Sequence, residues 1–188
     1  MNTIDNPLTP IDQGDVPFMQ TAIRYGLIGG AISVVVNLVS QLLGWADGTD
    51  VAMAAVVGII GLAVYIIAQV MGVRQHRDNE LGGYISFGRA FLVCLVIAMI
   101  MAVIASIFNY IYINFIDPEA MDRAMEAIRE QYEELGMSDE DIDNALAMVD
   151  MTKSPLMQIG GGIIGGAIMG GITGLITGAI MKKEPPLA

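Results

Sequence analysis

Residues 156–181 read LMQIGGGIIGGAIMGGITGLITGAIM, and this stretch decides the fold. It contains nine glycines, and five of them stand four residues apart: Gly162, Gly166, Gly170, Gly174 and Gly178. A four-residue step keeps these positions on one face of a helix, which we call the glycine ridge. In water, a glycine inside a helix costs about 1 kcal/mol relative to alanine, but a segment that crosses hydrocarbon must be helical because its backbone has no other partners there. The stretch therefore predicts a transmembrane helix whose bare face lets a second helix approach closely.

The composition of the whole chain also indicates a membrane protein. Of the 188 residues, 54% are hydrophobic and 15% are charged, whereas a soluble domain carries about 25% charged residues. Four apolar runs are longer than the roughly 18 residues that mark a spanning helix. We therefore predict an all-α polytopic membrane protein with transmembrane helices at about 22–45, 51–73, 90–116 and 154–183. Residues 1–20 and 184–188 are predicted to be tails, and residues 46–50 a short turn.

The only substantial polar region lies between the third and fourth apolar runs, at residues 117–153. Apolar residues recur there at helical spacing in two segments, separated near Gly136, so the region is predicted to be a helical hairpin. It carries twelve acidic and three basic residues, a net charge of −9. Its acidic run lacks the glycine of a calcium-binding loop, so we interpret the acids as a solvated helix face. Helix-start signals precede both segments, namely Asp117 with Pro118 and Ser138 with Asp141.

Polar residues form a stripe on the first predicted helix. Ser33, Asn37 and Gln41 stand four residues apart among small residues. One interpretation is that they line a polar path through the membrane. The other is that they form hydrogen bonds to neighbouring helices, each worth well under about 2 kcal/mol. The sequence leaves both interpretations open.

The connection between the second and third helices, residues 77–91, reads RDNELGGYISFGRAF. Gly82 and Gly83 are predicted to break the helix, and Tyr84 to lie among the lipid headgroups. Arg89 follows at the start of the third helix. We treat these four residues as a possible interaction loop.

Parts of this connection and of the end of the third predicted helix resemble a known family. The Gly-Gly-Tyr-Ile of residues 82–85, the Phe-Gly-Arg-Ala-Phe of residues 87–91 and the YINFIDPE of residues 112–119 are similar to segments of a bacterial family of four-helix inner-membrane proteins catalogued only as a domain of unknown function. The resemblance covers roughly residues 22–183. It implies the four-helix plan and the membrane location, and it brings no activity and no site residues. The many glycines of the last helix depart from the pattern and leave open whether the glycine ridge packs within the chain or against another protomer.

The basic residues predict an orientation in the membrane. One side of the predicted bundle receives six of them: Arg24, Arg74, Arg77, Arg89, Lys182 and Lys183. The other side receives three: Arg123, Arg129 and Lys153. Because basic residues are enriched on the cytoplasmic side, both termini are predicted to be cytoplasmic in a bacterial inner membrane, with the acidic hairpin outside.

Several kinds of chemistry find no support in the sequence. No charged residue lies near the middle of a predicted span, where proton relays need one. Gly160, Gly162 and Gly165 match a dinucleotide-binding pattern, but no strand precedes them and no acid follows at the required distance. His76 is the one histidine and has no second histidine or cysteine nearby to share a metal. A basic patch for nucleic acid is also absent, so we expect no enzyme activity, no cofactor, no metal and no nucleic-acid partner.

Two functional hypotheses remain. The first is a non-enzymatic structural or accessory subunit, whose partners are membrane lipids and either a second copy of the chain or another membrane protein. The hairpin or the interaction loop would meet that partner. The second is an oligomeric small-solute channel or a lipid or solute transporter, lined by the polar stripe and assembled through the glycine ridge.

Overall fold

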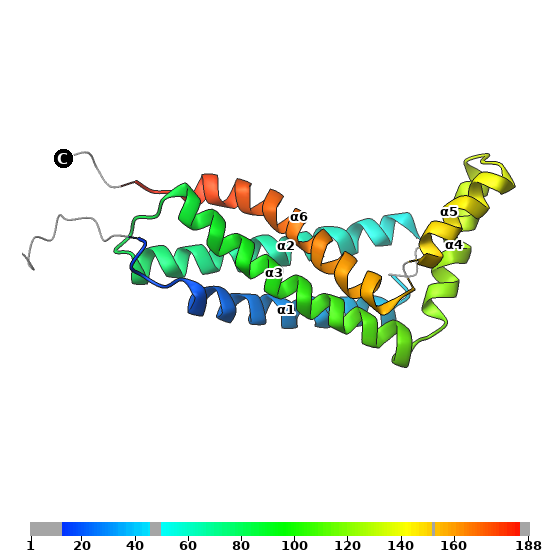
Figure 1. Cartoon of the computed structure of the whole chain (residues 1–188), viewed down its shortest axis with the longest axis horizontal. Coiled ribbons are helices and arrows are strands. Elements are labelled where there is room, and N and C mark those ends of the chain that lie inside the picture. Colours follow the sequence, from blue (N-terminus) through cyan, green and yellow to red (C-terminus); the bar gives the residue numbers. More distant parts are fainter. Residues whose placement is uncertain (1–12, 46–49, 152, 185–188) are drawn as a thin grey trace, which may run out of the picture.

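The computed structural model describes residues 13–45, 50–151 and 153–184. Four long helices form a bundle and two shorter ones form a hairpin at one end of it (Figure 1). The long helices are α1 (Met19–Leu42), α2 (Val51–Gln75), α3 (Phe87–Ile111) and α6 (Pro155–Met181). The hairpin consists of α4 (Ala120–Glu134) and α5 (Asp139–Met151), and two π-helical segments, η1 (His76–Glu80) and η2 (Tyr112–Ile116), continue α2 and α3.

Each long helix is long and apolar enough to cross a membrane. The predicted fold class is therefore confirmed: an all-α, multi-pass membrane protein with an acidic helical hairpin between its third and fourth spans. Residues 1–12, 46–49 and 185–188 lie outside the described residues, and they include most of the predicted N-terminal tail, the first turn and the C-terminal tail.

Local capping explains where two of the spans begin. The third span starts at Phe87, earlier than predicted, because the Ser86 hydroxyl accepts a hydrogen bond from the backbone N–H of Arg89 (3.3 Å). The fourth span starts at Pro155 behind a similar cap, in which the Ser154 hydroxyl accepts from the backbone N–H of Met157 (3.3 Å). A proline fits at this first helical position because its missing N–H would have had no partner. The first span also starts early, at Met19, inside the stretch predicted to be a tail.

The hairpin follows one of its two predicted start signals. Ser138 and Asp141 form the predicted capping contact, in which the Ser138 hydroxyl accepts from the Asp141 backbone N–H (3.3 Å). α4, however, begins at Ala120 after Glu119, so the placement of its start at Asp117 and Pro118 is wrong. The Asp117 carboxylate pairs with Arg123 (2.5 Å) and also accepts from the backbone N–H groups of Glu119 and Ala120.

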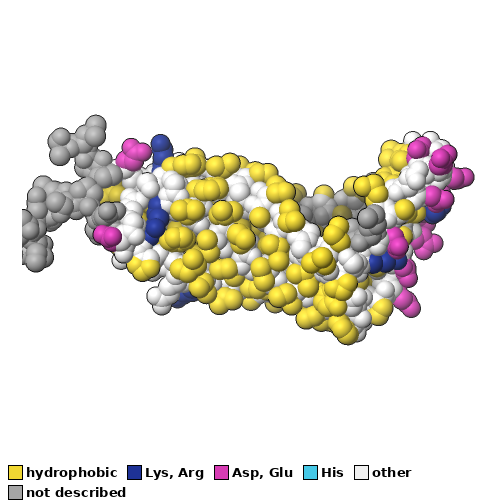
Figure 2. Space-filling view, in the orientation of Figure 1, with side chains coloured by type: hydrophobic (Ala, Val, Ile, Leu, Met, Phe, Trp, Pro, Cys, Tyr) yellow, Lys and Arg dark blue, Asp and Glu magenta, His cyan; other side chains and the backbone are white. Residues whose placement is uncertain are grey.

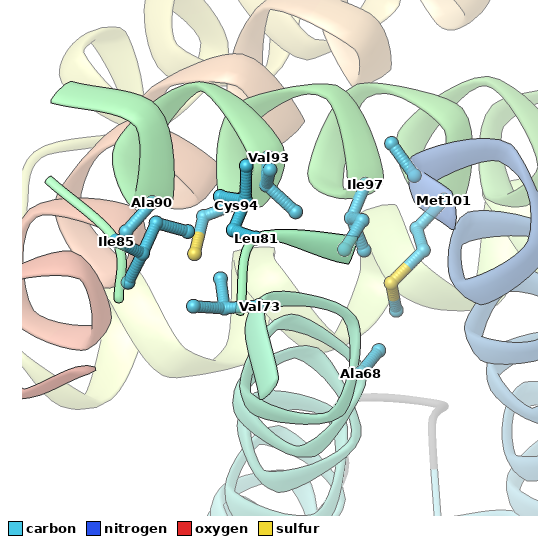
Figure 3. Close-up of a cluster of buried hydrophobic side chains, with 10 residues drawn as sticks. Ala68, Val73, Leu81, Ile85, Ala90, Val93, Cys94, Ile97 and Met101 are labelled. Atoms are coloured by element: carbon cyan, nitrogen blue, oxygen red, sulfur yellow. The ribbon is translucent and has the colours of Figure 1, made fainter. Parts of the chain in front are cut away.

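The tightest packing lies at the end of the bundle where α2 joins α3, which we call the connection end. A cluster of buried side chains there joins α2, the α2–α3 loop and α3 (Figure 3). It includes Val73, Leu81, Ile85, Ala90, Val93, Cys94, Ile97 and Met101. Cys94 is a small core residue, as its position in an apolar run indicates.

Packing is looser toward the other end, which carries α4 and α5 and which we call the hairpin end. All residues from Val51 to Ile60 of α2 except Val57 are exposed. At the start of α6, Leu156 is 81% exposed. Among the described residues the first half of α2 is therefore mostly exposed, and space opens between α2, α3 and α6.

The exterior of the bundle is apolar. Figure 2 shows hydrophobic side chains over the length of the bundle, with acidic side chains gathered on the hairpin. Isoleucines and valines such as Ile59 and Val35 are at least 60% exposed. Such a surface would aggregate in water and is stable in hydrocarbon, which agrees with a membrane location.

Candidate ligand-binding cavity

The glycine ridge faces α3 of the same chain. The two helices run antiparallel, so Gly162 lies opposite Ser106, Gly166 opposite Ala102, Gly170 opposite Ala98 and Gly174 opposite Cys94, while Gly178 lies over the backbone of Phe91. A side-chain carbon built on Gly162, Gly166 or Gly170 would overlap its partner. Every fourth residue of α3 along this contact is small, so the two backbones approach closely. The neighbouring Gly165 and Gly171 meet nothing within 4 Å.

A buried glutamine links α2 to this pair of helices. Gln69 is fully buried, and its side-chain amide donates to the Thr173 hydroxyl on α6 (2.9 Å) and lies 3.4 Å from the Cys94 carbonyl oxygen on α3. The Thr177 hydroxyl donates back to the Gln69 side-chain oxygen (3.4 Å). Gln69 therefore joins three helices inside the bundle, and it forms the inner limit of the more open half.

Beyond Gln69, toward the hairpin end, lies a cavity of about 410 Å³ between all four long helices. We call it the main cavity. Its polar lining comes from every helix, namely Asn37, Tyr65, Ser106, Asn109, Gln158 and Thr173. Glycines line much of the remainder and keep the space open, because carbons added at Gly58, Gly61 or Gly165 would meet no other atom within 4 Å. The volume lies in the range of sites that hold small molecules.

A second cavity of about 150 Å³ adjoins the main cavity, since Asn37, Gly61, Tyr65 and Ala105 line both. Ser33 also lines it. The Ser33 hydroxyl and the Asn37 side-chain oxygen are buried and have no hydrogen-bond partner among the residues that the structure describes. Buried polar atoms are nearly always paired, and each unpaired one costs about 1–3 kcal/mol. The two atoms therefore indicate that something else pairs with them.

Only two of the three residues of the polar stripe lie at these cavities. The structure brings Ser33 and Asn37 together at these cavities, while Gln41 is not among the residues that line them. Tyr65, Gln69 and Thr173 complete the polar surroundings and were not candidates from sequence. A signal for two of them exists, because Gly61, Tyr65 and Gln69 follow one another at four-residue steps on α2.

An apolar groove lies along the seam between α2 and α6. It has a volume of about 220 Å³ and is lined by Ile66, Val70, Ile176, Ile180 and Met181, together with Thr173 and Thr177. Thr173 lines both this groove and the main cavity. The main cavity and the groove therefore lie next to each other at Thr173, and the lining changes from polar to apolar along α6.

The interaction loop packs against its own chain. Gly82 and Gly83 have φ values of +68° and +94°, which favour glycine and turn the chain sharply after η1. Ile85 then forms an antiparallel bridge with Lys183, whose ammonium group lies 5.4 Å from the Tyr84 ring centre. The loop therefore holds the end of α6, and only part of it is exposed.

Arg89 belongs to a buried polar network at the connection end. Its Nε donates to His76 Nε2 (3.2 Å), its Nη2 donates to the Val16 carbonyl oxygen, and its guanidinium lies 4.5 Å from the Phe18 ring centre. His76 is fully buried, and its Nδ1 lies 2.6 Å from a Glu80 carboxylate oxygen. The segment before α1 covers His76, whose ring centre lies 6.3 Å from that of Phe18.

This network is poorly suited to catalysis. Because His76 Nε2 accepts a hydrogen bond from Arg89, its Nδ1 carries the proton donated to Glu80, and neither ring nitrogen is available as a base. Among residues 13–45, 50–151 and 153–184 no group of three histidine, cysteine or acidic side chains is arranged to hold a metal. The arrangement at this end ties together the segment before α1, η1 and α3.

The comparisons with known proteins give one match. A family model described as "Protein of unknown function (DUF4199)" matches residues 24–183. No curated protein and no solved structure matches the chain.

Proposed function

The chain belongs to this family of unknown function, and we propose that it is a non-enzymatic membrane protein that binds a small molecule or lipid inside its own four-helix bundle. The observation that carries the proposal is the pair of unpaired polar atoms, on Ser33 and Asn37, beside an open cavity in the membrane-spanning part. In hydrocarbon such atoms have no water to pair with. A bound ligand with a hydrogen-bond donor would satisfy them.

The proposal differs from an oligomeric pore assembled through the glycine ridge. The ridge is covered by α3 of the same chain, so a second protomer could use it only after α6 had left α3. The loose packing between α2 and α6 provides a route into the cavity from the surrounding lipid. This supports a carrier or binding protein that works as a single chain.

Cavity filling tests the proposal. Gly61 lines both cavities, and a carbon added there meets nothing within 4 Å, so Gly61→Phe should fill the space without moving a helix. Gly171→Phe is the control, because a carbon added at Gly171 also meets nothing, and this residue lines neither cavity. The two variants and the wild-type protein would be purified from membranes and the retained molecules counted by native mass spectrometry.

We expect the wild-type protein and Gly171→Phe to retain a bound molecule and Gly61→Phe to lose it. The proposal falls if no molecule remains on the wild-type protein, or if a folded Gly61→Phe protein retains it equally well.

An accessory role through a partner protein has support from the hairpin. α4 and α5 project from the bundle (Figure 1), and Leu135 and Met148 are 71% and 72% exposed there. A photo-crosslinking residue at position 148 should capture a protein partner in native membranes. Capture of lipid alone would contradict this second role.

The location we propose is a bacterial inner membrane with both termini in the cytoplasm. It is supported by the basic residues near the connection end, including Arg74 and Lys182, and by the acidic surface of the hairpin. In a Cys94→Ala background, an impermeant thiol reagent should label Ser138→Cys on intact cells and label Lys182→Cys only after the membrane is opened. The reverse pattern would overturn this orientation.

A further inference from the structure

We propose that the ligand is an uncharged lipid-like amphiphile, with a hydroxyl- or amide-bearing head in the main cavity and a hydrocarbon chain in the groove between α2 and α6. The inference rests on the proposed function and adds the class of ligand. It is drawn from a neutral polar cavity and an apolar groove that lie next to each other and share Thr173 in their linings.

The head must be uncharged because the cavity offers it no opposite charge. None of the described residues that line the main cavity or the adjoining one is acidic or basic. Moving an ion out of water without a partner is strongly unfavourable. A phosphate or ammonium head would therefore stay among the lipid headgroups, outside the cavity.

The head must also donate a hydrogen bond. The unpaired atom of Asn37 is its side-chain oxygen, which only accepts. The Ser33 hydroxyl can accept or donate. A hydroxyl or amide N–H would pair with Asn37, and a hydroxyl oxygen could at the same time accept from Ser33. A plain hydrocarbon would leave both atoms unpaired, so it is excluded as the ligand.

The hydrocarbon chain of the proposed ligand fits the groove between α2 and α6. The two threonines of the groove are already bonded, since Thr173 donates to the Met169 carbonyl oxygen (2.8 Å) and Thr177 donates to Gln69. The rest of the lining named above is aliphatic or methionine. The groove therefore presents an apolar surface that matches a hydrocarbon chain and offers a polar group no free partner.

Photo-crosslinking of defined lipids tests the inference. The full chain would be reconstituted in phosphatidylglycerol vesicles with a trace of monoacylglycerol that carries a diazirine in its chain. A second sample would contain the same diazirine chain on phosphatidylglycerol. Sites of labelling would be mapped by mass spectrometry.

We expect monoacylglycerol to label residues of the groove and unlabelled monoacylglycerol to compete with it, while phosphatidylglycerol labels only the outer surface. Replacing the two unpaired atoms, with Ser33→Ala and Asn37→Leu, should lower labelling by about tenfold, as expected for the loss of one or two hydrogen bonds. Ile176→Trp should block the groove, whereas Ile172→Trp should leave labelling unchanged. Ile176 and Ile172 are both exposed residues of α6 (58% and 51%), and only Ile176 lines the groove.

The outcomes separate the two proposals. One such outcome is that phosphatidylglycerol labels the groove to the same extent as monoacylglycerol, with labelling that Gly61→Phe abolishes. That result would overturn the uncharged class of ligand and leave the proposed function standing. Labelling of the groove by neither lipid, together with no molecule retained on the purified protein, would overturn both.

Discussion

Gly170 of α6 lies directly against Ala98 of α3, so closely that a single added carbon on the glycine would overlap the alanine methyl group. A carbon added on the next residue, Gly171, would meet no atom within 4 Å. A side chain therefore fits at Gly171 and does not fit at Gly170. The difference depends only on which face of the helix each glycine occupies.

Gly170→Leu should destabilise the bundle by about 1–3 kcal/mol or more, because the added side chain must push α6 away from α3. Thermal unfolding in mild detergent measures the change. Gly171→Leu adds the same atoms to the same helix and should change stability little. Equal unfolding temperatures for the two variants would show that the close contact of α6 with α3 is not what the glycines provide.

Gln69→Leu should weaken the contact of α2 with α6. The variant removes the hydrogen bond from Gln69 to Thr173 (2.9 Å), and such bonds in membrane proteins are worth about 0.6 kcal/mol on average and up to about 1.7 kcal/mol. A double-mutant cycle with Thr173→Val isolates the pair. Additive effects of the two substitutions would mean that this hydrogen bond contributes nothing.

The spacing of residues was sufficient to predict the spans and the ridge. Glycines at four-residue steps define a face from sequence alone, and Ala98 and Ala102 on α3 repeat the same step. The sequence left open whether the ridge meets its own chain, because periodicity describes one helix at a time. The pairing appears only when the antiparallel register places Gly166 at Ala102 and Gly170 at Ala98.

The sequence was less informative about the polar groups. His76 and Arg89 lie at the ends of apolar runs, and the sequence did not indicate that the segment before α1 covers both of them. Ser33 and Asn37 were open to two interpretations, and the lack of hydrogen-bond partners for their buried atoms argues against simple pairing between helices. Whether a polar side chain finds a partner depends on contacts between distant segments, which local patterns do not contain.

Asn37→Leu should stabilise the protein when no ligand is present. The unpaired oxygen costs about 1–3 kcal/mol, and an apolar side chain of similar size removes that cost. The measurement is thermal unfolding of delipidated protein. Ser40→Ala serves as the control on the same helix, since the Ser40 hydroxyl already donates to the Val36 carbonyl oxygen (2.8 Å) and should give no such gain. A clear loss of stability in Asn37→Leu would mean that its oxygen is paired after all.

Arg89→Ala should release the segment that precedes α1. Arg89 bonds the Val16 carbonyl oxygen and lies over the Phe18 ring, so its loss should lower the free energy of local opening by about 1.5–3 kcal/mol. Faster hydrogen exchange at residues 16–22, with the exchange of α3 unchanged, is the expected result. Arg24→Ala, which removes an exposed arginine nearby, should leave exchange in this segment at the wild-type rate. Similar exchange in both variants would contradict the role given to Arg89.

The junction between η2 and α4 should respond to acid. The Arg123 guanidinium donates to Asp117 (2.5 and 3.3 Å) and lowers the pKa of that carboxyl below its ordinary value, helped by the backbone N–H groups of Glu119 and Ala120. Because the pKa is lower in the folded chain, the carboxylate stabilises the fold above the unfolded value of about 3.9. That contribution is lost as the pH falls through the lowered folded value.

Carbon NMR of the aspartate side chains measures this titration. Arg123→Gln should raise the pKa of Asp117 toward its ordinary value, while Arg129→Gln, which removes the partner of Asp143, should leave it unchanged. If the pKa of Asp117 stays the same in Arg123→Gln, the ion pair with Arg123 does not stabilise the carboxylate at this junction.

A density map of the full chain in lipid nanodiscs that contain monoacylglycerol tests the central claim most directly. The account predicts an elongated density that begins beside Ser33 and Asn37 and continues past Thr173 along Ile176, with the glycine ridge closed against α3. A bundle in which α2 and α6 meet and no space remains between them, or a cavity that holds only isolated water, would contradict it.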